Sequence, residues 1–586
     1  MCSIIGYYGD NTAAPILVNA LKRMEYRGYD SVGIATKSEN QISVKKGIGK
    51  VSEVNESLKL STLPGHIGIG HTRWATHGKV TVVNAHPHPS NSGKIVIVHN
   101  GIIENFNELK ENLQKDGFEF KSETDTEVIA NLIQQNFSKS SNVKESILKT
   151  VSQLKGHYAF VAMFEDGTLA AARFHEPLII GIGQNSYFVS SDVLGFIEKT
   201  DDAIYLDNGN IAIIASSKLK IFSFDGEQIK KPITKVAKEF AQVDKGDFAH
   251  YTIKEISEQP ETILKAGEDT IEALENTADF IKHAKNVYFT GSGTSFNAAL
   301  LAKYLLSKYA KIKVEPIISS ELSSIPESIE PNSILIAISQ SGESADVLEA
   351  VKIAKQQNAK ILSIVNSSPS SLVEESSQVI RMGCGPEIGV AATKSFTSQL
   401  AIIYKITEKL CDGCIGIDFK KVSQAIENIL SDQTKIQDIA KELKVVSDIY
   451  IIGRGMHHPI AMEAALKLKE LTYIHAEGIA AGELKHGPLA LMDSNVFVII
   501  INPDDSTYTD TITSANEIKS RGAKIIGISD KNSDVYDYWI QIPKIDESMY
   551  PIIEIIPIQL LAYYSAVEKE TDPDYPRNLA KSVTVK

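Results

Sequence analysis

The second half of the chain repeats itself, and this repeat constrains the fold more than any other feature. NVYFTGSGTSFNAALLAKYL resembles DIYIIGRGMHHPIAMEAALKL, with Gly291 matching Gly453, 162 residues later. AKILSIVN likewise resembles AKIIGISD, with Ala359 matching Ala523. Each copy alternates buried apolar strands with long helical periods, which is typical of parallel α/β structure. The sequence therefore predicts two copies of one doubly wound unit.

The first 240 residues have a different pattern. Short β-type runs such as KIVIVHNGII are separated by Gly, Asn and Asp turn residues, which predicts mostly antiparallel sheet with a few helices. A polar stretch lies where the pattern changes, and we interpret it as an interdomain linker. We expect a multidomain protein of α+β and α/β class. The predicted ranges are a first domain at 1–240, a linker at 241–262, repeat domains at 263–430 and 431–577, and a tail at 578–586.

Composition restricts the partners and the compartment. The 586 residues include 60 Lys and Arg against 73 Asp and Glu, and the net charge of −13 argues against a nucleic acid or an anionic membrane as main partner. The most apolar stretch, from Pro551, is interrupted by Glu554 and Pro557 and is too short to span about 30 Å of hydrocarbon. The N-terminus MCSIIGYYGD has no signal-peptide pattern, so we expect a cytoplasmic protein without a membrane span.

Four cysteines, at positions 2, 384, 411 and 414, are too few for a disulfide framework, which agrees with a reducing compartment. Cys411 and Cys414 have zinc-knuckle spacing, but no second pair or His cluster accompanies them, so we interpret them as a helix end and a polar loop. The HPHP run from His86 favours an irregular loop over a metal site. We expect no metal.

Cys2 offers a specific chemistry. Removal of the initiator Met leaves a thiol beside its own α-amino group, whose pKa of about 8 lets it act as a base near neutral pH. Nucleophile and base then belong to one residue. The alternative is a small buried N-terminal cysteine without a catalytic role.

Three further motifs suggest what this thiol attacks. Arg73, in HTRWATHG, can hold a carboxylate with two hydrogen bonds, and Asp125, in SETDTEV, can pair with an ammonium group. Asn100 and Gly101, in HNGIIENF, can present a side-chain amide and a backbone N–H to one developing oxyanion. Together they describe hydrolysis of a glutamine side-chain amide. The alternatives are a surface ion pair for Arg73, a plain turn residue for Asn100 and a helix N-cap for Asp125.

These motifs, with CSIIGYYG and EYRGYDSVG, resemble the N-terminal-nucleophile glutaminases of class II amidotransferases. The resemblance implies two antiparallel sheets sandwiched between helices, with Cys2 as nucleophile and with Asn100 and Gly101 as the oxyanion hole. It also implies glutamine contacts from Arg73, Trp74, Thr76, His77 and Asp125.

In the second half, GSGTS follows a strand and precedes a helix. It is not a dinucleotide fingerprint, because Phe296 stands where a third Gly is needed, and it lacks the GK[ST] of a P-loop. Neutral donors at a helix N-terminus suit one phosphate monoester, and SQSGES offers a second set. The predicted phosphate ligands are Thr294, Ser295, Ser339, Gln340, Ser341 and Ser344. The second copy has GRG and NPDDS instead, so only the first copy is equipped for a phosphate. Ordinary turn and N-cap residues are the alternative.

Charged residues in the second copy could move a proton between neighbouring sugar carbons. Glu463, Lys467 and Glu470 fall on one face of a helix, and His486 lies between glycine-rich turns. Lys581, in the tail, could form a Schiff base with a ketose carbonyl. The alternatives are a salt-bridged surface stripe for the helix residues and a solvated side chain for Lys581.

QSGES, EIGVAATKSF, ALKLKE, IHAEG, AGELKHGPLAL and PRNLAKSVTV resemble the sugar isomerase (SIS) fold. With the first domain, nearly the whole chain resembles the isomerising glutamine:fructose-6-phosphate amidotransferases. The resemblance implies that Glu470 moves the proton, His486 opens the sugar ring, Lys581 forms the Schiff base and Lys467 assists the imine chemistry. It also implies the substrates glutamine and fructose 6-phosphate, no organic cofactor, and a homodimer in which His486 serves the neighbouring subunit.

The sequence departs from the family pattern at one site residue, and two other functions are possible alternatives. The family usually has Thr where Ser344 stands, but the hydroxyl is kept. A class II amidotransferase with a phosphoribosyl acceptor would need an acidic phosphoribosyl-pyrophosphate loop, which we do not find. A non-catalytic sugar-phosphate sensor would not need Cys2, Glu470 and Lys581 together.

Overall fold

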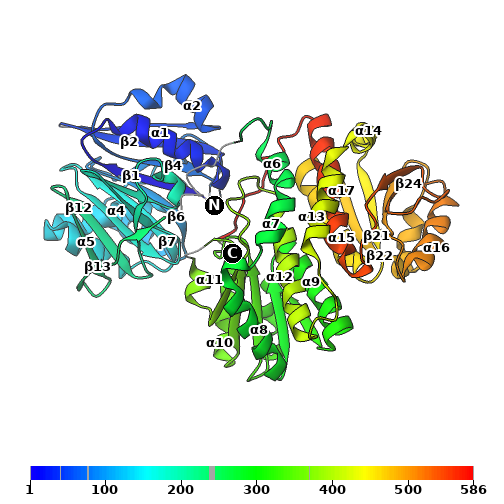
Figure 1. Cartoon of the computed structure of the whole chain (residues 1–586). Helices are drawn as coiled ribbons and strands as arrows, with labels where there is room; N and C mark the ends of the chain where they lie inside the picture. The colour runs from blue at the N-terminus through cyan, green and yellow to red at the C-terminus, as the bar shows by residue number, and fades with distance from the viewer. Residues whose placement is uncertain (1, 40, 76–77, 237–244, 368–369, 585–586) are drawn as a thin grey trace. The chain divides into compact units, whose positions relative to one another are not determined.

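The computed structural model describes residues 2–39, 41–75, 78–236, 245–367 and 370–584 (Figure 1). Backbone contacts divide the chain into a first unit, Met1–Asp244 with Ala580–Lys586, and a second unit, Lys245–Leu579. The expected linker at 241–262 contains α6 (Tyr251–Ser257) and most of α7 (Gln259–Lys265), and both helices belong to the second unit. The final residues, by contrast, group with the first unit.

Two antiparallel sheets form the centre of the first unit. In the described residues, one sheet has the order β15 (Thr234–Lys235), β11 (Asp202–Tyr205), β9 (Ile179–Gly183), β10 (Ser186–Ser190), β1 (Ser3–Tyr8), β4 (Ile67–Arg73), β2 (Ser31–Ser38) and β3 (Gln41–Ile48). The other has the order β14 (Gln228–Ile229), β13 (Lys218–Ser223), β12 (Asn210–Ala215), β8 (Leu169–Phe174), β7 (Gly156–Phe164), β6 (Ile95–Ile103) and β5 (His88–Pro89). The first strand of the chain is thus an interior strand.

Helices cover the outer face of each sheet. The helices are α1 (Ala13–Arg23), α2 (Val51–Leu58), α3 (Phe106–Lys115), α4 (Thr126–Ser140) and α5 (Val143–Val151). α1 packs on β1 and β4, while α4 packs on β6. Apolar side chains such as Ile4, Val98 and Val161 fill the space between the sheets. The predicted sandwich of antiparallel sheets between helices is therefore confirmed.

The second unit contains two parallel sheets of the same topology. One has the order β17 (Val314–Ile318), β16 (Val287–Gly291), β18 (Ile334–Ser339), β19 (Lys360–Val365) and β20 (Gln378–Arg381). The other has the order β22 (His475–Ala480), β21 (Asp448–Gly453), β23 (Phe497–Ile501), β24 (Lys524–Ser529) and β25 (Tyr538–Gln541). Each is the doubly wound order 2-1-3-4-5, which confirms the two copies predicted from the repeat.

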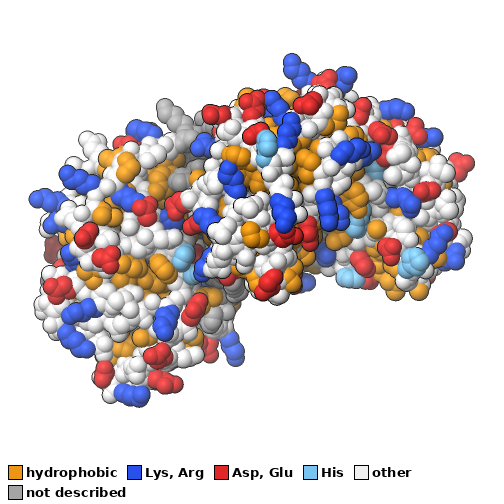
Figure 2. Space-filling view, turned by 90° about the horizontal axis from the view of Figure 1, so that it is seen from below, with side chains coloured by type: hydrophobic (Ala, Val, Ile, Leu, Met, Phe, Trp, Pro, Cys, Tyr) orange, Lys and Arg blue, Asp and Glu red, His pale blue; other side chains and the backbone are white. Residues whose placement is uncertain are grey.

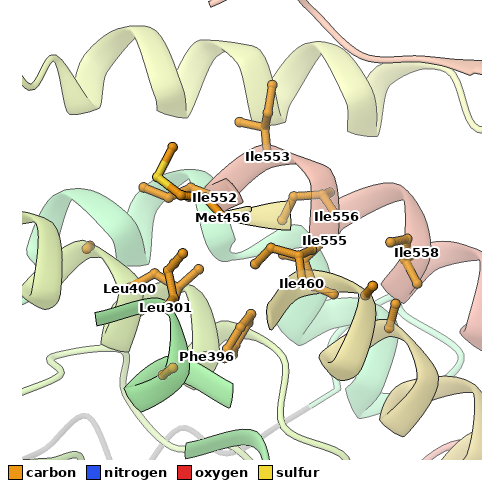
Figure 3. Packing of buried hydrophobic residues seen from close by; sticks show 14 of the residues in the cluster. Leu301, Phe396, Leu400, Met456, Ile460, Ile552, Ile553, Ile555, Ile556 and Ile558 are labelled. Atoms are coloured by element: carbon orange, nitrogen blue, oxygen red, sulfur yellow. The ribbon is translucent and has the colours of Figure 1, made fainter. Parts of the chain in front are cut away.

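One apolar core joins the two copies. The remaining helices are α8 (Ile271–His283), α9 (Thr294–Leu305), α10 (Ala345–Gln356), α11 (Ser371–Glu374), α12 (Lys394–Leu410), α13 (Phe419–Ser431), α14 (Thr434–Glu442), α15 (His457–Thr472), α16 (Tyr508–Lys519) and α17 (Tyr550–Glu568). Figure 3 shows Leu301 of α9, Phe396 of α12, Ile460 of α15 and Ile555 of α17 in one cluster. Each copy contributes two helices, so neither has a complete core alone.

The apolar stretch from Pro551 forms α17, which runs through Pro557. A window of this helix is long and apolar enough to cross a membrane, but 89% of that window is buried within the second unit. Its residues belong to the shared core, which is the setting of an internal helix. Figure 2 shows positive and negative side chains interspersed on one face of the molecule, as the nearly balanced composition leads one to expect.

Cys411 and Cys414 lie just beyond the end of α12, as predicted, but they are joined by a disulfide, which the sequence analysis did not expect. The bridge is local, because the two cysteines are only three residues apart in the chain. Cys2 and Cys384 are free thiols.

The turn after β21 requires a glycine for steric reasons. A Cβ atom on Gly453 would lie 2.2 Å from the backbone oxygen of His457. Gly291, its counterpart in the first copy, would bring a Cβ atom within 2.8 Å of the backbone of Ser295. In both copies the helix thus begins directly against the end of the strand.

Gly453→Ala should therefore destabilise the second unit by about 1–3 kcal/mol, since the backbone must move to accept the methyl group. Thermal unfolding of the purified protein measures the effect. Gly482→Ala is the control, because its added Cβ meets nothing closer than 3.6 Å. Equal melting temperatures for both variants would contradict the steric argument.

Candidate functional site

Cys2 lies immediately before β1, which holds it in the middle of a sheet. β1 pairs with β4 on one side and β10 on the other. The backbone N–H of Trp74, at the end of β4, donates to Cys2 Sγ at 3.3 Å. Burial raises the pKa of the thiol, and this hydrogen bond and the charge of Arg73 act against the rise. A base is therefore needed to generate the thiolate.

Asn100 and Gly101 of β6 lie beside this thiol. The Asn100 side-chain amide donates to the carbonyl oxygen of Cys2 at 3.0 Å, and its own oxygen is 3.2 Å from His71 Nε2. Gly101 has φ +107°, and a Cβ atom there would lie 2.0 Å from the carbonyl oxygen of His157. Only glycine fits this position without strain.

The cavity at Cys2 contains most of the predicted glutamine contacts. It is lined by Cys2, Arg73, Trp74, His86, His99, Gly101, Thr124, Asp125 and Thr126. Asp125 is 6% exposed, and one carboxylate oxygen accepts from the Ile103 N–H at 2.8 Å. The Arg73 guanidinium is buried and donates to the carbonyl oxygens of Gly78 and Lys79. Thr76 and His77 lie outside the described residues.

The motif EYRGYDSVG also supplies a residue that sequence analysis did not single out. Arg27 Nε donates to the Cys2 carbonyl oxygen at 3.4 Å, and its guanidinium pairs with Asp192 at 3.2 Å. In the sequence, the one signal for this role is that Arg27 lies within the motif EYRGYDSVG. Arg27 and Asn100 together fix the backbone of the nucleophile.

Buried histidines surround the cavity. His71 and His86 stack with ring centroids 4.0 Å apart, and burial lowers the pKa of His71 to about 3. Burial likewise holds the pKa of His86 and His88 well below its usual range. These rings are neutral at pH 7. Within the described part of the chain, no three His, Cys, Asp or Glu side chains are arranged to hold a metal ion.

In the second unit, the two predicted phosphate loops meet at one point. β16 and β18 are adjacent parallel strands, and GSGTS and SQSGES follow their carboxyl ends. The strand order reverses between them, and ligands bind at such a position in doubly wound sheets. The loops therefore form one candidate site.

The hydroxyl groups in these loops are neutral and are held by hydrogen bonds. Ser339 Oγ lies 3.2 Å from Ser344 Oγ and accepts from the Gly342 N–H at 3.0 Å. Ser295 Oγ, in the first turn of α9, accepts from the Gln399 amide of α12 at 3.2 Å. None of these hydroxyl and amide groups carries a charge, so a phosphate bound here would be held by neutral donors.

Glu463, Lys467 and Glu470 are not the surface stripe that their spacing also allowed. Lys467 and Glu463 side chains are 0% exposed, and Lys467 Nζ lies 3.3 Å from Glu463 and 2.6 Å from Glu470. Glu463 accepts from Thr294 Oγ1 at 2.9 Å and from the Asn297 amide at 2.8 Å. Burial acts to lower the pKa of Lys467, but the two carboxylates raise it instead. The network links α15 to the phosphate loop of the first copy.

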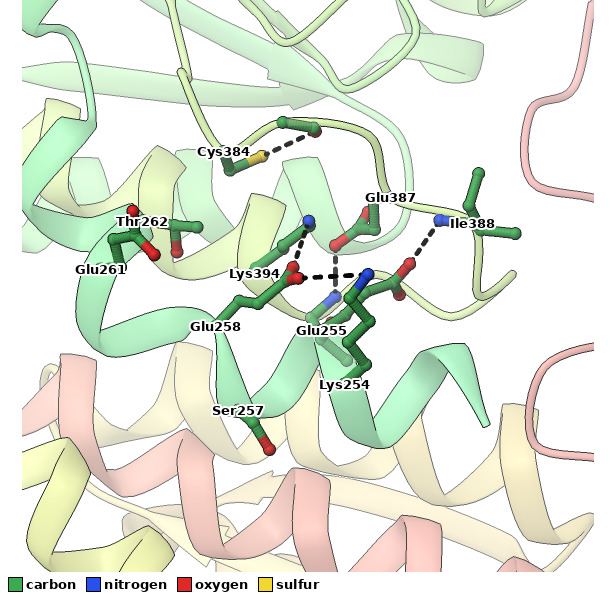
Figure 4. Close-up of polar contacts among 12 residues, drawn as sticks. Lys254, Glu255, Ser257, Glu258, Glu261, Thr262, Cys384, Glu387, Ile388 and Lys394 are labelled. Carbon is green, nitrogen blue, oxygen red and sulfur yellow. Dashed lines mark hydrogen bonds and ion pairs between the residues drawn. The ribbon is translucent and has the colours of Figure 1, made fainter. Parts of the chain in front are cut away.

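The segment EIGVAATKSF is held by a second buried network (Figure 4). The Lys394 ammonium pairs with Glu258 of the α6–α7 junction at 2.6 Å. Glu255 of α6 accepts from the Ile388 and Gly389 N–H groups. Glu387 accepts from Ser395 Oγ at 2.7 Å. The beginning of the second unit therefore fixes the loop that leads into α12.

Glu470 also borders an open cavity of about 320 Å³. The cavity is lined by Lys469, Glu470, Tyr473, Ile474, His475, Arg577, Asn578 and Leu579. Thus the chain immediately before the tail lies beside the proposed proton carrier. His486 is exposed on a 3-10 turn, Ala481–His486, and Lys581 groups with the first unit. The roles expected of both residues stay predictions.

Comparison with known proteins divides the chain in the same way. The model of the glutamine amidotransferase domain matches residues 71–197, and that of the SIS domain matches residues 280–408 and 442–569. Two isomerizing glutamine–fructose-6-phosphate aminotransferases, from Pyrococcus horikoshii and Thermococcus kodakarensis, are 43% and 42% identical, over 100% of both chains in each case. This chain belongs to that family.

A solved structure of the aminotransferase family supports the assignment for the second unit. The C-terminal domain of glucosamine-fructose-6-phosphate aminotransferase from Francisella tularensis is 35% identical, with a TM-score of 0.51. It covers 57% of this chain and 100% of that chain. The amidotransferase match thus lies within the first unit, and the two SIS matches lie within the second.

The buried Lys467 can be tested by stability. Lys467→Met should cost about 3–5 kcal/mol, because it leaves the Glu463 carboxylate buried without its counter-charge. Adding Glu463→Gln should recover most of the loss, and denaturant unfolding of single and double variants measures both effects. Lys441→Met, which removes an exposed ion pair with Asp438, is the control and should change little. Additive losses in the double variant would contradict the coupling.

Proposed function

We propose that the chain converts glutamine and fructose 6-phosphate into glutamate and glucosamine 6-phosphate. The observation that carries the proposal is one chain with two sites: a buried thiol beside Asn100 and Gly101, and a neutral phosphate cradle coupled to Lys467 and Glu470. The first releases ammonia, and the second moves it to a sugar. Family membership and both domain matches support this pairing.

In the first unit, the α-amine of processed Cys2 takes the thiol proton, and the thiolate attacks the carboxamide carbon of glutamine. The Asn100 amide and the Gly101 N–H stabilise the resulting oxyanion. Ammonia leaves with the proton that the amine returns, and water then hydrolyses the thioester to glutamate. Arg73 and Asp125 would hold the α-carboxylate and α-ammonium groups, with Trp74, Thr76 and His77 as further contacts.

In the second unit, the phosphate of the sugar would lie between the two loops, held by Ser339, Gln340, Ser341 and Ser344, with Thr294 and Ser295. His486 of a neighbouring subunit opens the ring, which makes the active enzyme a homodimer. The Lys581 amine forms an imine at C2 with loss of water, and ammonia then displaces the lysine. Glu470 carries a proton from C1 to C2, and the product is the aldose with an amine at C2. Lys467 assists the imine chemistry.

The remaining assignments follow from this reaction. It needs no organic cofactor, because the imine chemistry uses Lys581. We also propose that the enzyme is cytoplasmic and has no nucleic-acid or membrane partner, in line with its net charge of −13.

A product assay with trapping of the imine tests the proposal. Purified protein should form glucosamine 6-phosphate from the two substrates, and borohydride should reduce fructose 6-phosphate covalently onto Lys581. Lys581→Ala should lose both while keeping glutamine hydrolysis, because the thiol site does not use this lysine. Lys421→Ala, at a surface lysine 81% exposed, is the control. A trapped sugar at another lysine would refute the role of Lys581, and no product in wild type would refute the function.

Glutaminase activity should require removal of Met1, since an extended N-terminus has no α-amine on Cys2. Mass spectrometry of the intact protein beside a glutaminase assay measures this, and Cys2→Ala should lose hydrolysis altogether. Asn100→Ala should lower kcat by about 100- to 1,000-fold, as expected for an oxyanion donor. Full activity in protein that retains Met1 would rule out the base assigned to Cys2.

A further inference from the structure

The second repeat contains a buried triad that the proposed reaction does not use. His457, the first residue of α15, lies between two carboxylates. Its Nε2 is 3.0 Å from Asp505 in the β23–α16 loop, and its Nδ1 is 2.9 Å from Glu554 of α17. Exposed fractions are 1% for the His457 side chain, 3% for Asp505 and 0% for Glu554. Three separate segments of the repeat therefore meet at one imidazole.

The triad occupies the positions that form the phosphate cradle in the first repeat. With Gly291 matched to Gly453, His457 corresponds to Ser295. The strand register matches β18 to β23, because Val287 pairs with Ile334 and its counterpart Ile449 pairs with Phe497.

Continuing that match into the next loop places Asp505 where the first repeat has Gly342, and Thr507 where it has Ser344. Asp505 thus lies in the counterpart of SQSGES, and His457 in the counterpart of GSGTS. In the second repeat, the counterpart of each phosphate loop therefore contains a charged residue of the triad.

The third partner follows the same correspondence. In the first repeat, Gln399 of α12 donates to Ser295 Oγ at 3.2 Å. In the second repeat, the equivalent helix α17 presents Glu554 to His457. A neutral hydroxyl–amide pair in one copy is thus replaced by a charged imidazole–carboxylate pair in the other.

The charges in the second repeat are complementary. Burial acts to lower the pKa of His457, but Glu554 and Asp505 outweigh it and raise the value to about 10. The ring is therefore an imidazolium at pH 7. Asp505 also accepts from the Thr507 N–H at 2.7 Å and from Thr507 Oγ1 at 2.8 Å. Its carboxylate thus has a cation, a hydroxyl and a backbone N–H around it, the ligand set of a bound anion.

We propose that the second repeat contains a closed anion site, in which the Asp505 carboxylate takes the place of a phosphate group and His457 is its counter-charge. The comparison with the first repeat rests on the proposed function. The buried ion pair of the second repeat stands on its own geometry. Removal of the Asp505 carboxylate should therefore open a site for a small oxyanion.

Calorimetric titration with inorganic phosphate tests this in the full-length protein. Asp505→Ala should bind one more phosphate per chain than wild type. Adding His457→Gln to Asp505→Ala should abolish that extra site, because the cation is gone. Asp504→Ala is the matched control: it removes the neighbouring carboxylate, which pairs with Lys531 and Lys544 at 3.3 Å on the surface, and should add no site.

Phosphate should also raise the melting temperature of Asp505→Ala more than that of wild type, by about 4 °C at 100 times the dissociation constant. If the variant folds poorly, phosphate should increase its folded fraction. The proposal would be overturned if Asp505→Ala showed neither an extra phosphate site nor rescue of folding by phosphate. It would also be overturned if Asp504→Ala gained a phosphate site of its own. Wild type that binds no fructose 6-phosphate would refute the proposed function alone, because the extra site is counted relative to wild type.

Discussion

The second unit depends on the contact between α9 and α15, and Glu463 is the centre of that contact. Its carboxylate is fully buried, so it is stable only because Thr294, Asn297 and Lys467 surround it with donors. Two of these partners come from the first repeat and one from the second. The same bonds that bury the charge therefore align the GSGTS loop of one repeat with α15 of the other, the helix that contains Glu470.

The apolar core makes this alignment rigid. α9, α12, α15 and α17 contribute to one cluster, so the two repeats cannot separate without exposing it. Because interiors are close-packed, a shift of α15 would disturb Ile460 and Ile555 together. Glu470 lies near the end of α15, where the helix leaves the core and reaches the open cavity. Rigid support at one end and access at the other would suit the proton transfer that we propose for Glu470.

Several features could be predicted from the sequence because they are local. The repeat predicted both parallel sheets, and the turn motifs predicted where strands end. The spacing of Glu463, Lys467 and Glu470 predicted one helix face, but a surface stripe and a buried network have the same spacing. Which one forms depends on α9, which is about 170 residues away in the chain. The triad of His457, Asp505 and Glu554 was missed for the same reason, since its members come from three segments. The contact of Arg27 with the Cys2 backbone could not be predicted, because the sequence shows this arginine only as one residue of a motif.

The position of β1 has a consequence for synthesis of the chain. Its neighbours β4 and β10 end at Arg73 and Ser190, so the strand cannot complete its pairing until 190 residues have been made. At about 5–20 residues per second, this takes roughly 10–40 s. During that interval the amino end is outside a finished sheet and open to a processing aminopeptidase. The topology thus delays the burial of Cys2 for long enough that maturation can precede folding.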